Sequence, residues 1–380
     1  MSGVKKSEII SVASPHTVKK FELIESYIYA WAQTRVEDDF NNEIVFIDCM
    51  CNSGIYKDSI DGTIIKGTPL RIVEILRGVA RSNPDKSIQI YFNDISDGKV
   101  NELRKHLPEN ERNFQIVSSV GDGNELLKTI GPQLQANKHI HFFLLYDPYD
   151  ASIDWSALAP FLRNKGEVII NHMVSDPARA ITVASKTITK EKYKSTYLSE
   201  FEQLVPYGSD IQAYEDRVEK IIDKLKGPRK YFVSAFPFYN RQNTQIYSLV
   251  HCTENFAEFK RYKQCAWQVF GAQSSTKHTS GEQYQLMLNF DPNVSGSITV
   301  ETDKSCFNIC DIAKYLNRMF SGQGYVPLSA LWSALDKHPV FPSQLYEKQI
   351  ISALEDIYRV TRCNRINPDT GREETFISFW

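Results

Sequence analysis

The stretch "EIVFIDCMCNSGIYKDSIDGTIIKGTPLRIVEIL", residues 43–76, decides the fold. It opens with the apolar run 44–47, which is typical of a buried strand and ends at the carboxylate of Asp48. A turn with one glycine, Gly54, follows, and after an intervening stretch residues 67–69, Gly-Thr-Pro, signal the start of a helix. Strand, turn and helix in this order outline a nucleotide-binding first turn, although most of the glycines that such turns carry are missing.

Apolar runs alternate with helical patterns along the next part of the chain. Further strands are predicted at residues 88–94, 114–122, 139–148 and 167–173. Because continuous apolar strands between helices are buried on both faces, the pattern predicts a parallel sheet covered by helices on each side. Residues 230–239 and 244–252 predict two closing strands joined by a short polar turn. The expected fold class is therefore α/β, with a doubly wound sheet closed by a hairpin.

The length of 380 residues predicts two to three domains. We expect an N-terminal helical segment over residues 1–42, because apolar residues recur there at helical spacing, namely Phe21, Ile24, Ile28 and Trp31. The α/β domain is expected over residues 43–300, with a polar and charged helical insertion at about 177–230. A third domain is expected over residues 301–380.

The C-terminal residues follow a different pattern. Three short helical segments are followed by two strands around the turn signal "NPDTGR", residues 367–372. Three helices and a hairpin predict a winged-helix module. Its third helix carries Glu347, Glu355 and Asp356, and these negative charges argue against a position in the major groove of DNA.

Composition restricts the class of protein. The hydrophobic content of 42% is that of a globular chain, and no apolar run approaches the roughly 18 residues that span a bilayer, so no membrane contact is expected. The N-terminus lacks the apolar region of a signal peptide, and the seven cysteines are an odd number, which favours reduced thiols in a cytoplasmic protein. A net charge of −2 means that any nucleic acid must be held by local basic patches.

Four of the predicted strands end at an aspartate: Asp48, Asp94, Asp122 and Asp147. Ligands of doubly wound sheets bind at the carboxyl ends of the strands, so these side chains are candidates for a binding site. Asp94, after the second strand, is placed to accept hydrogen bonds from ribose hydroxyls. Asp122 is placed to meet an adenine amino group, or alternatively to cap the helix that follows it.

The string "LLYDPYD", residues 144–150, resembles the Asp-Pro-Pro-Tyr signature of methyltransferases that modify exocyclic amino groups of bases. Such chemistry needs an acceptor that orients the amine and an aromatic face that stacks on an extruded base. Asp147 and Tyr149 would fill these catalytic roles, with Pro148 between them. Because the second proline is absent, a strand end turned by proline and an ordinary capping aspartate remains the alternative.

The order of the motifs as a whole resembles that of the three-Cys-motif partner proteins of bacteria and archaea. The matching residues are His16, Thr17 and Lys20; Asp48, Gly54 and Tyr56; Gly67, Thr68, Pro69 and Leu70; and Asp147, Pro148 and Tyr149. The resemblance covers nearly the whole chain. It implies a methyltransferase-like sheet with a helical insertion, a C-terminal winged-helix module and S-adenosylmethionine as cofactor.

We expect the cofactor to be bound by the loop residues Asp48, Cys51, Asn52 and Gly54, together with Asp94 and Asp122 at the ends of the next strands. This chain departs from the family in the loop, where Met50, Cys51 and Asn52 replace phenylalanine, alanine and glycine. Asparagine tolerates positive φ better than most residues, so we expect the turn to survive.

The remaining motifs bear on metal and nucleic-acid binding. The pairs Cys49 and Cys51, and Cys306 and Cys310, lack a second pair or a histidine at metal spacing, so no metal site is expected. Two basic sets could contact phosphates, or could simply be solvated: Lys186, Lys190, Lys192 and Lys194 in the insertion, and Arg359, Arg362, Arg365 and Arg372 in the predicted wing.

Three functional hypotheses follow from the sequence. The first is an S-adenosylmethionine-dependent methyltransferase that acts on nucleic acid. The second is a catalytically silent scaffold or nucleic-acid-binding partner in a phage-defence or processing complex. The third, a nuclease that uses the clustered aspartates and a divalent ion, is weaker because the spacing of the acids fits a nucleoside ligand.

Overall fold

The computed structural model describes residues 9–278, 306–367 and 371–380. The chain divides into two compact units, the first formed by Met1–Ala235 with Gln245–Tyr262 and the second by Phe236–Thr244 with Lys263–Trp380. The boundary expected at residue 300 lies outside the described residues, and the boundary expected at residue 42 remains a prediction.

A seven-strand sheet lies mostly in the first unit, although residues 236–239 of its strand β9 belong to the second. Its strands are β2 (Glu43–Asp48), β5 (Ser87–Asp94), β6 (Phe114–Val120), β7 (Ile140–Tyr146), β8 (Gly166–Met173), β9 (Phe232–Tyr239) and β10 (Gln245–Thr253). They lie in the order β6-β5-β2-β7-β8-β10-β9. The first five are parallel, and β10 runs antiparallel to β8. The predicted mixed α/β fold with a doubly wound sheet is therefore confirmed, and strand order reverses beside β2.

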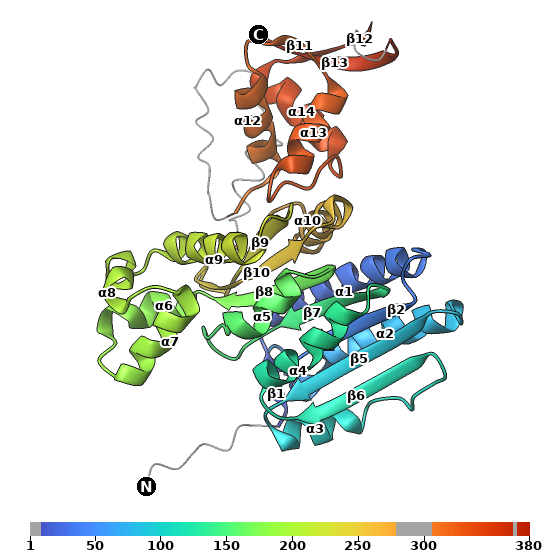
Figure 1. The fold of residues 1–380 in the computed structure, drawn as a ribbon. Coiled ribbons are helices and arrows are strands. Elements are labelled where there is room, and N and C mark those ends of the chain that lie inside the picture. The colour runs from blue at the N-terminus through green and yellow to red at the C-terminus, as the bar shows by residue number, and fades with distance from the viewer. Residues whose placement is uncertain (1–8, 279–305, 368–370) are drawn as a thin grey trace. The chain divides into compact units, whose positions relative to one another are not determined.

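Helices cover both faces of this sheet (Figure 1). They include α1 (Pro15–Val36), α2 (Thr68–Ser82), α3 (Asp97–Arg104), α4 (Gly123–Ala136), α5 (Trp155–Leu162) and α10 (Phe256–Phe270). Adjacent residues of β7 point to opposite faces: the Phe143 ring lies 5.3 Å from Trp31 of α1, and the Phe142 ring lies 5.3 Å from Phe161 of α5. Burial on both faces explains why the central strands β2 and β7 are mostly apolar.

The predicted N-terminal helix and the predicted helix start after the loop are both present. Phe21, Ile24, Ile28 and Trp31 of α1 are buried, as their spacing indicated. Ser14 caps α1, and Gly67 stands at the N-cap of α2 with a proline in its first turn.

The segment expected to be a helical insertion is mostly helical. It consists of α6 (Ser175–Ala180), η1 (Ile181–Val183), α7 (Thr187–Tyr197), α8 (Phe201–Leu204), η2 (Val205–Tyr207) and α9 (Ile211–Leu225). Its aromatic residues pack together, with the Tyr197 and Tyr214 rings 5.2 Å apart. The Trp155 indole donates to the Thr196 carbonyl at 2.7 Å, which fixes the insertion to α5.

A small sheet beside the first loop was not predicted. It contains β1 (Ser11–Ala13), β3 (Ile55–Asp58) and β4 (Ile64–Lys66), in the order β1-β3-β4. Strands of three or four residues are too short to give a period in the sequence. The small sheet brings the segment before α1 next to the loop that follows β2, because β1 pairs with β3.

The second unit contains the three predicted helices and the predicted hairpin. The elements are α12 (Ile309–Phe320), β11 (Gly324–Pro327), α13 (Leu328–Lys337), α14 (Glu347–Tyr358), β12 (Thr361–Ile366) and β13 (Glu373–Phe379). Strand β11 was not predicted, and it pairs with β13 in an antiparallel sheet of order β11-β13-β12. Residues 368–370 of the predicted turn lie outside the described residues. Among the described helices, none is long and apolar enough to cross a membrane.

Candidate active site

The loop after β2 has the sharp turn that the sequence indicated. Asp48 is buried, and one of its oxygens accepts a hydrogen bond from the Met50 amide at 3.3 Å. Asn52 has a φ of 61° and Gly54 has a φ of 75°. The prediction that asparagine supports the turn at positive φ is therefore confirmed.

Asn93 joins this loop to the neighbouring strand ends, and sequence reasoning missed it. Its backbone carbonyl accepts from the Cys51 amide at 2.8 Å. Its side-chain amide donates to the carbonyls of Cys49 at 3.1 Å and Gly121 at 2.9 Å. Because one buried residue of β5 satisfies groups from the loops after β2 and β6, the ends of these three strands are held in a fixed arrangement.

Asp94 lies at the centre of the site and has no exposed surface. Its Oδ1 accepts from the Ser96 amide at 2.9 Å, and its Oδ2 accepts from the Asn52 amide at 2.9 Å. The hydroxyl of Tyr149 also donates to Oδ2. The structure thus brings Asn52 and Tyr149 into direct contact with Asp94, and all three are predicted site residues.

Lys99 of α3 supports this contact and was not predicted. Its ammonium donates to the Tyr149 hydroxyl at 3.1 Å and lies 4.5 Å from the centre of the ring. Burial lowers the pKa of Lys99, although the charge of Asp94 opposes this effect. Burial, and then the hydrogen bond to Asp94, raise the pKa of Tyr149, so its phenol is neutral.

Asp147 contacts two further residues that the catalytic interpretation of the sequence did not include. The ammonium of Lys20, on α1, lies 2.5 Å from Oδ2, and the side-chain amide of Asn171, on β8, donates to Oδ1. The Asp147 and Lys20 side chains are 23% and 11% exposed. Pro148, between Asp147 and Tyr149, is buried and turns the chain after β7.

The charges of the neighbouring carboxylates act on Asp48. Burial, and next the charge of Asp147, raise the pKa of Asp48 to about 8, with a smaller contribution from Asp94. Asp48 is therefore protonated at neutral pH. Burial and the charge of Asp147 also raise the pKa of Tyr56 and of Tyr247. The end of the sheet is a polar region in which negative charge is partly neutralised by lysine and by protonation.

Asp122 lies apart from these contacts. It is the N-cap of α4, and its Oδ1 accepts from the amides of Asn124 at 2.7 Å and Glu125 at 3.4 Å. The helix-capping alternative is therefore present in the structure. Contact with an adenine amino group remains a prediction.

The cysteines are explained by packing. All seven are free thiols. Cys49 and Cys51 are buried in the loop after β2, and burial raises the pKa of both thiols well above the usual range. Within the part of the chain that the structure describes, no three His, Cys, Asp or Glu side chains form a group that could hold a metal ion. The nuclease hypothesis therefore has no ligand set there.

Several residues of the two basic sets contact acidic or aromatic side chains. Lys192 lies 2.8 Å from Asp176, and Lys194 lies 3.1 Å from Glu200. In the hairpin of the second unit, Arg362 lies 2.6 Å from Glu355. The guanidinium of Arg365 lies 3.2 Å from the centre of the Tyr325 ring. Lys186 stands at the N-cap of α7, Lys190 lies over the Phe201 ring, Arg359 ends α14 and Arg372 precedes β13.

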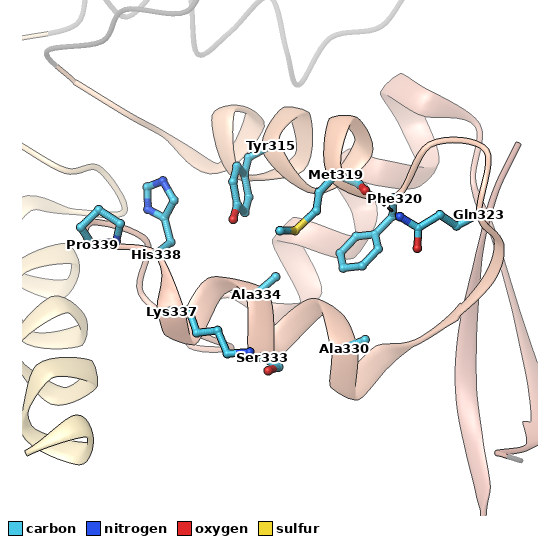
Figure 2. A pocket seen from close by; sticks show the side chains of 10 residues that line it. All are labelled: Tyr315, Met319, Phe320, Gln323, Ala330, Ser333, Ala334, Lys337, His338 and Pro339. Carbon is cyan, nitrogen blue, oxygen red and sulfur yellow. Dashed lines mark hydrogen bonds between the residues drawn. The ribbon is translucent and has the colours of Figure 1, made fainter. Parts of the chain in front are cut away.

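A groove of about 700 Å³ lies between α12 and α13 of the second unit (Figure 2). Tyr315 and Met319 of α12 face Ala334 of α13 across it. Burial, and then the charge of Lys263, lower the pKa of His338 to about 4. The neutral imidazole accepts from the Val340 amide at 3.2 Å, so its role in the groove wall is structural.

Comparisons with known proteins show likeness in structure only. No family model matches the chain, and no curated protein matches it. A Legionella pneumophila protein of family DUF519 has a TM-score of 0.38 at 10% identity, over 62% of this chain and 85% of that one. Trm1 from Pyrococcus horikoshii, solved with S-adenosyl-L-methionine, has a TM-score of 0.33 at 12% identity, over 65% of this chain and 58% of that one. The methyltransferase PaMTH1 from Podospora anserina, bound to SAH, has a TM-score of 0.26 at 13% identity, over 59% of this chain and 76% of that one.

Proposed function

We propose that this protein is an S-adenosylmethionine-dependent methyltransferase that modifies an amino group of a nucleic-acid base. The observation that carries the proposal is the meeting of Asp48, Asp94 and Asp147 at the carboxyl ends of three adjacent strands, beside the point where strand order reverses. Ligands of doubly wound sheets bind at this point. The antiparallel closing strand β10 gives the sheet the strand arrangement of methyltransferase-like Rossmann folds, which supports the proposal.

The residues present fit a nucleoside cofactor. Asp94 Oδ1 accepts one hydrogen bond, from Ser96, and a carboxylate oxygen has two lone pairs, so this oxygen retains acceptor capacity for a ribose hydroxyl. The turn from Asn52 to Gly54, with Asp48 and Cys51, would hold the methionine end. Asp122 would meet the adenine. When bound, the cofactor supplies an electrophilic methyl group.

Asp147 is the proposed acceptor for the substrate amine. Lys20 and Asn171 use one acceptor position on each of its oxygens, so each oxygen can still accept an N–H. A carboxylate at this position orients the amine and stabilises the positive charge that develops on nitrogen as it is methylated. Tyr149, which is 55% exposed, would stack on the extruded base.

The second unit is the proposed nucleic-acid-binding module. Its order of helix, strand, two helices and two strands, with β11 paired to β13, supports a winged helix. The arginines of the β12–β13 hairpin would contact phosphates as a wing does. Glu347, Glu355 and Asp356 of α14 make that helix a poor partner for a major groove.

A silent scaffold is the second candidate, and one observation favours it. Tyr149 and Lys20 contact the carboxylates of Asp94 and Asp147, on which cofactor binding and amine methylation would depend. The motif order supports kinship with the three-Cys-motif partner proteins. On this alternative the protein serves as a nucleic-acid-binding partner in a phage-defence or processing complex.

Calorimetry with S-adenosylhomocysteine tests the cofactor site. We expect the wild type to bind, and Asp94→Ala to weaken binding by about 10-fold to 100-fold, since a charge-assisted hydrogen bond contributes roughly 1.5 to 3 kcal/mol. The control is Asp97→Ala, which removes the same charge from an exposed position three residues away. Equal affinity of the wild type and Asp94→Ala would remove Asp94 from the site.

Transfer of a tritiated methyl group to mixed DNA and RNA tests catalysis. Labelled nucleic acid with the wild type, and none with Asp147→Asn, is the expected result. Cofactor binding without transfer to any nucleic acid would leave the scaffold function. If the wild type binds no cofactor, we would conclude that the loop with Cys51 and Asn52 has lost the ability to bind it.

A further inference from the structure

Tyr149 and Asp94 are in direct contact, although the proposed function gives them separate ligands. Asp94 is assigned to the ribose of the cofactor, and Tyr149 to the substrate base. In the structure the Tyr149 hydroxyl donates to Oδ2 of Asp94, the same oxygen that accepts from the Asn52 amide. The two hydrogen bonds use both lone pairs of this oxygen. A ribose has two neighbouring hydroxyls: one can bind the remaining acceptor position of Oδ1, but the second can bind Oδ2 only after Tyr149 has left it.

The contact is supported from the side of the tyrosine as well. The Lys99 ammonium donates to the Tyr149 hydroxyl at 3.1 Å and lies 4.5 Å from the ring centre. Lys99 is 7% exposed, whereas Tyr149 is 55% exposed. The hydroxyl is thus held between two charged groups while the ring remains accessible. We call Tyr149, Asp94 and Lys99 the tyrosine lock.

We propose that the tyrosine lock occupies the ribose position at Asp94, so that the cofactor displaces the Tyr149 hydroxyl and thereby releases the ring to stack on the substrate base. The inference rests on the proposed function, whose cofactor site it deepens. A side chain cannot donate to Asp94 and also move to a base outside the loop, so the two positions of Tyr149 exclude each other. The binding order is therefore cofactor first and nucleic acid second.

The lock has a quantitative consequence for affinity. We call the protein open when the Tyr149 hydroxyl has left Asp94. For a ligand that binds only the open protein, the apparent affinity equals the intrinsic affinity multiplied by the fraction of the protein that is open. Removing the hydroxyl in Tyr149→Phe removes the competitor for Asp94 and keeps the ring. We expect Tyr149→Phe to bind S-adenosylhomocysteine about tenfold more tightly than the wild type, which corresponds to an open fraction of roughly one tenth in the wild type.

Calorimetry of the full chain with S-adenosylhomocysteine tests this expectation. The control is Tyr29→Phe, since Tyr29 is 58% exposed and lies on α1. Unchanged or weaker binding by Tyr149→Phe, with binding by the wild type, would overturn the lock and leave the proposed function standing. Absence of binding by the wild type and by both variants would overturn the proposed function and the lock with it.

Nitration by tetranitromethane tests the lock without a ligand. The reagent attacks the phenolate, and Tyr149 and Tyr29 have similar exposure. With the lock in place, peptide mapping of the free protein will show Tyr149 nitrated several-fold more slowly than Tyr29, and S-adenosylhomocysteine will accelerate nitration of Tyr149 alone. Equal rates in the free protein would overturn the lock, whatever the affinity for the cofactor.

Discussion

The ammonium of Lys20 lies 2.5 Å from Oδ2 of Asp147, although the two residues are 127 positions apart. Both side chains are mostly buried, so the pair is shielded from solvent and salt. The contact fixes α1 to the carboxyl end of β7. Asp147, the proposed amine acceptor, therefore also forms an ion pair with Lys20. The contribution of this ion pair to stability can be measured separately from catalysis.

A double-mutant cycle measures this pair. Lys20→Met and Asp147→Asn each remove one charge, and we expect a coupling energy of about 1.5 to 3 kcal/mol in urea unfolding, as for hydrogen bonds to charged groups. The control cycle uses Lys19 and Glu22, a pair 2.8 Å apart whose side chains are 44% and 38% exposed. Because solvent screens this exposed pair, its coupling energy should be below about 0.5 kcal/mol. Similar coupling in the two cycles would contradict the structural role of Lys20.

The Asp48→Asn variant is predicted to be more stable than the wild type, by a difference in the free energy of unfolding that grows as pH rises. Burial and the charge of Asp147 raise the pKa of Asp48 to about 8, so the folded chain holds a proton there that the unfolded chain loses near pH 4. Between these values the native state binds more protons, and the wild type loses stability as pH increases, by up to about 1.4 kcal/mol per pH unit. Asparagine resembles the protonated carboxyl and has no such loss.

Urea unfolding at pH 5, 7 and 9 checks this prediction. The stability difference between Asp48→Asn and the wild type should grow with pH, whereas Asp39→Asn, at an exposed position, should show no such growth. A constant difference across the three pH values would mean that Asp48 titrates normally.

The hairpin of the second unit is predicted to contact phosphates. Changing Arg362, Arg365 and Arg372 together to alanine should weaken binding of a labelled mixed-sequence oligonucleotide and lower the salt dependence by about one unit of slope for each phosphate that is no longer neutralised. Fluorescence anisotropy at several salt concentrations measures both. The charge-matched control changes the surface cations Arg81, Lys105 and Lys128, which lie in the first unit. An unchanged slope in the hairpin variant would assign this surface to a protein partner.

The sequence predicted the features that depend on local pattern. Buried strands next to one another in the sheet, the Gly67 helix start and the positive φ of Asn52 each follow from a few neighbouring residues. Asp94 could be placed because the carboxyl ends of parallel strands meet at one edge.

The contacts that complete the site could not be predicted in this way. Lys20 was singled out only as a match in the family resemblance, with no indication of a contact with Asp147. Asn171 lies in an apolar strand and has no local signal for its contact with Asp147. Lys99 meets Tyr149 only because α3 and the end of β7 are brought together by the sheet order. The short strands β1 and β11 were missed because pairing with distant strands, and not a sequence period, stabilises them.

The last prediction separates cofactor binding from catalysis in the loop after β2. Gly54 has a φ of 75°, and a Cβ placed on it would lie 2.5 Å from Cδ1 of Leu103 and 3.2 Å from Cγ of Leu70. Valine there would combine backbone strain with overlap against two side chains. Gly54→Val should therefore displace the loop and reduce S-adenosylhomocysteine binding at least tenfold in calorimetry, with methyl transfer falling in proportion.

Asp147→Asn should reduce methyl transfer without reducing cofactor binding, because this residue acts on the substrate amine. Its affinity for the cofactor should stay within about twofold of the wild type, while methyl transfer is abolished. Gly78→Ala controls for the general effect of replacing glycine. This residue lies inside α2 with nothing within 4 Å of an added Cβ, so alanine should stabilise the helix by about 0.5 to 1 kcal/mol and leave binding unchanged. If Gly54→Val binds the cofactor as tightly as the wild type, the loop after β2 does not hold the methionine end of the cofactor.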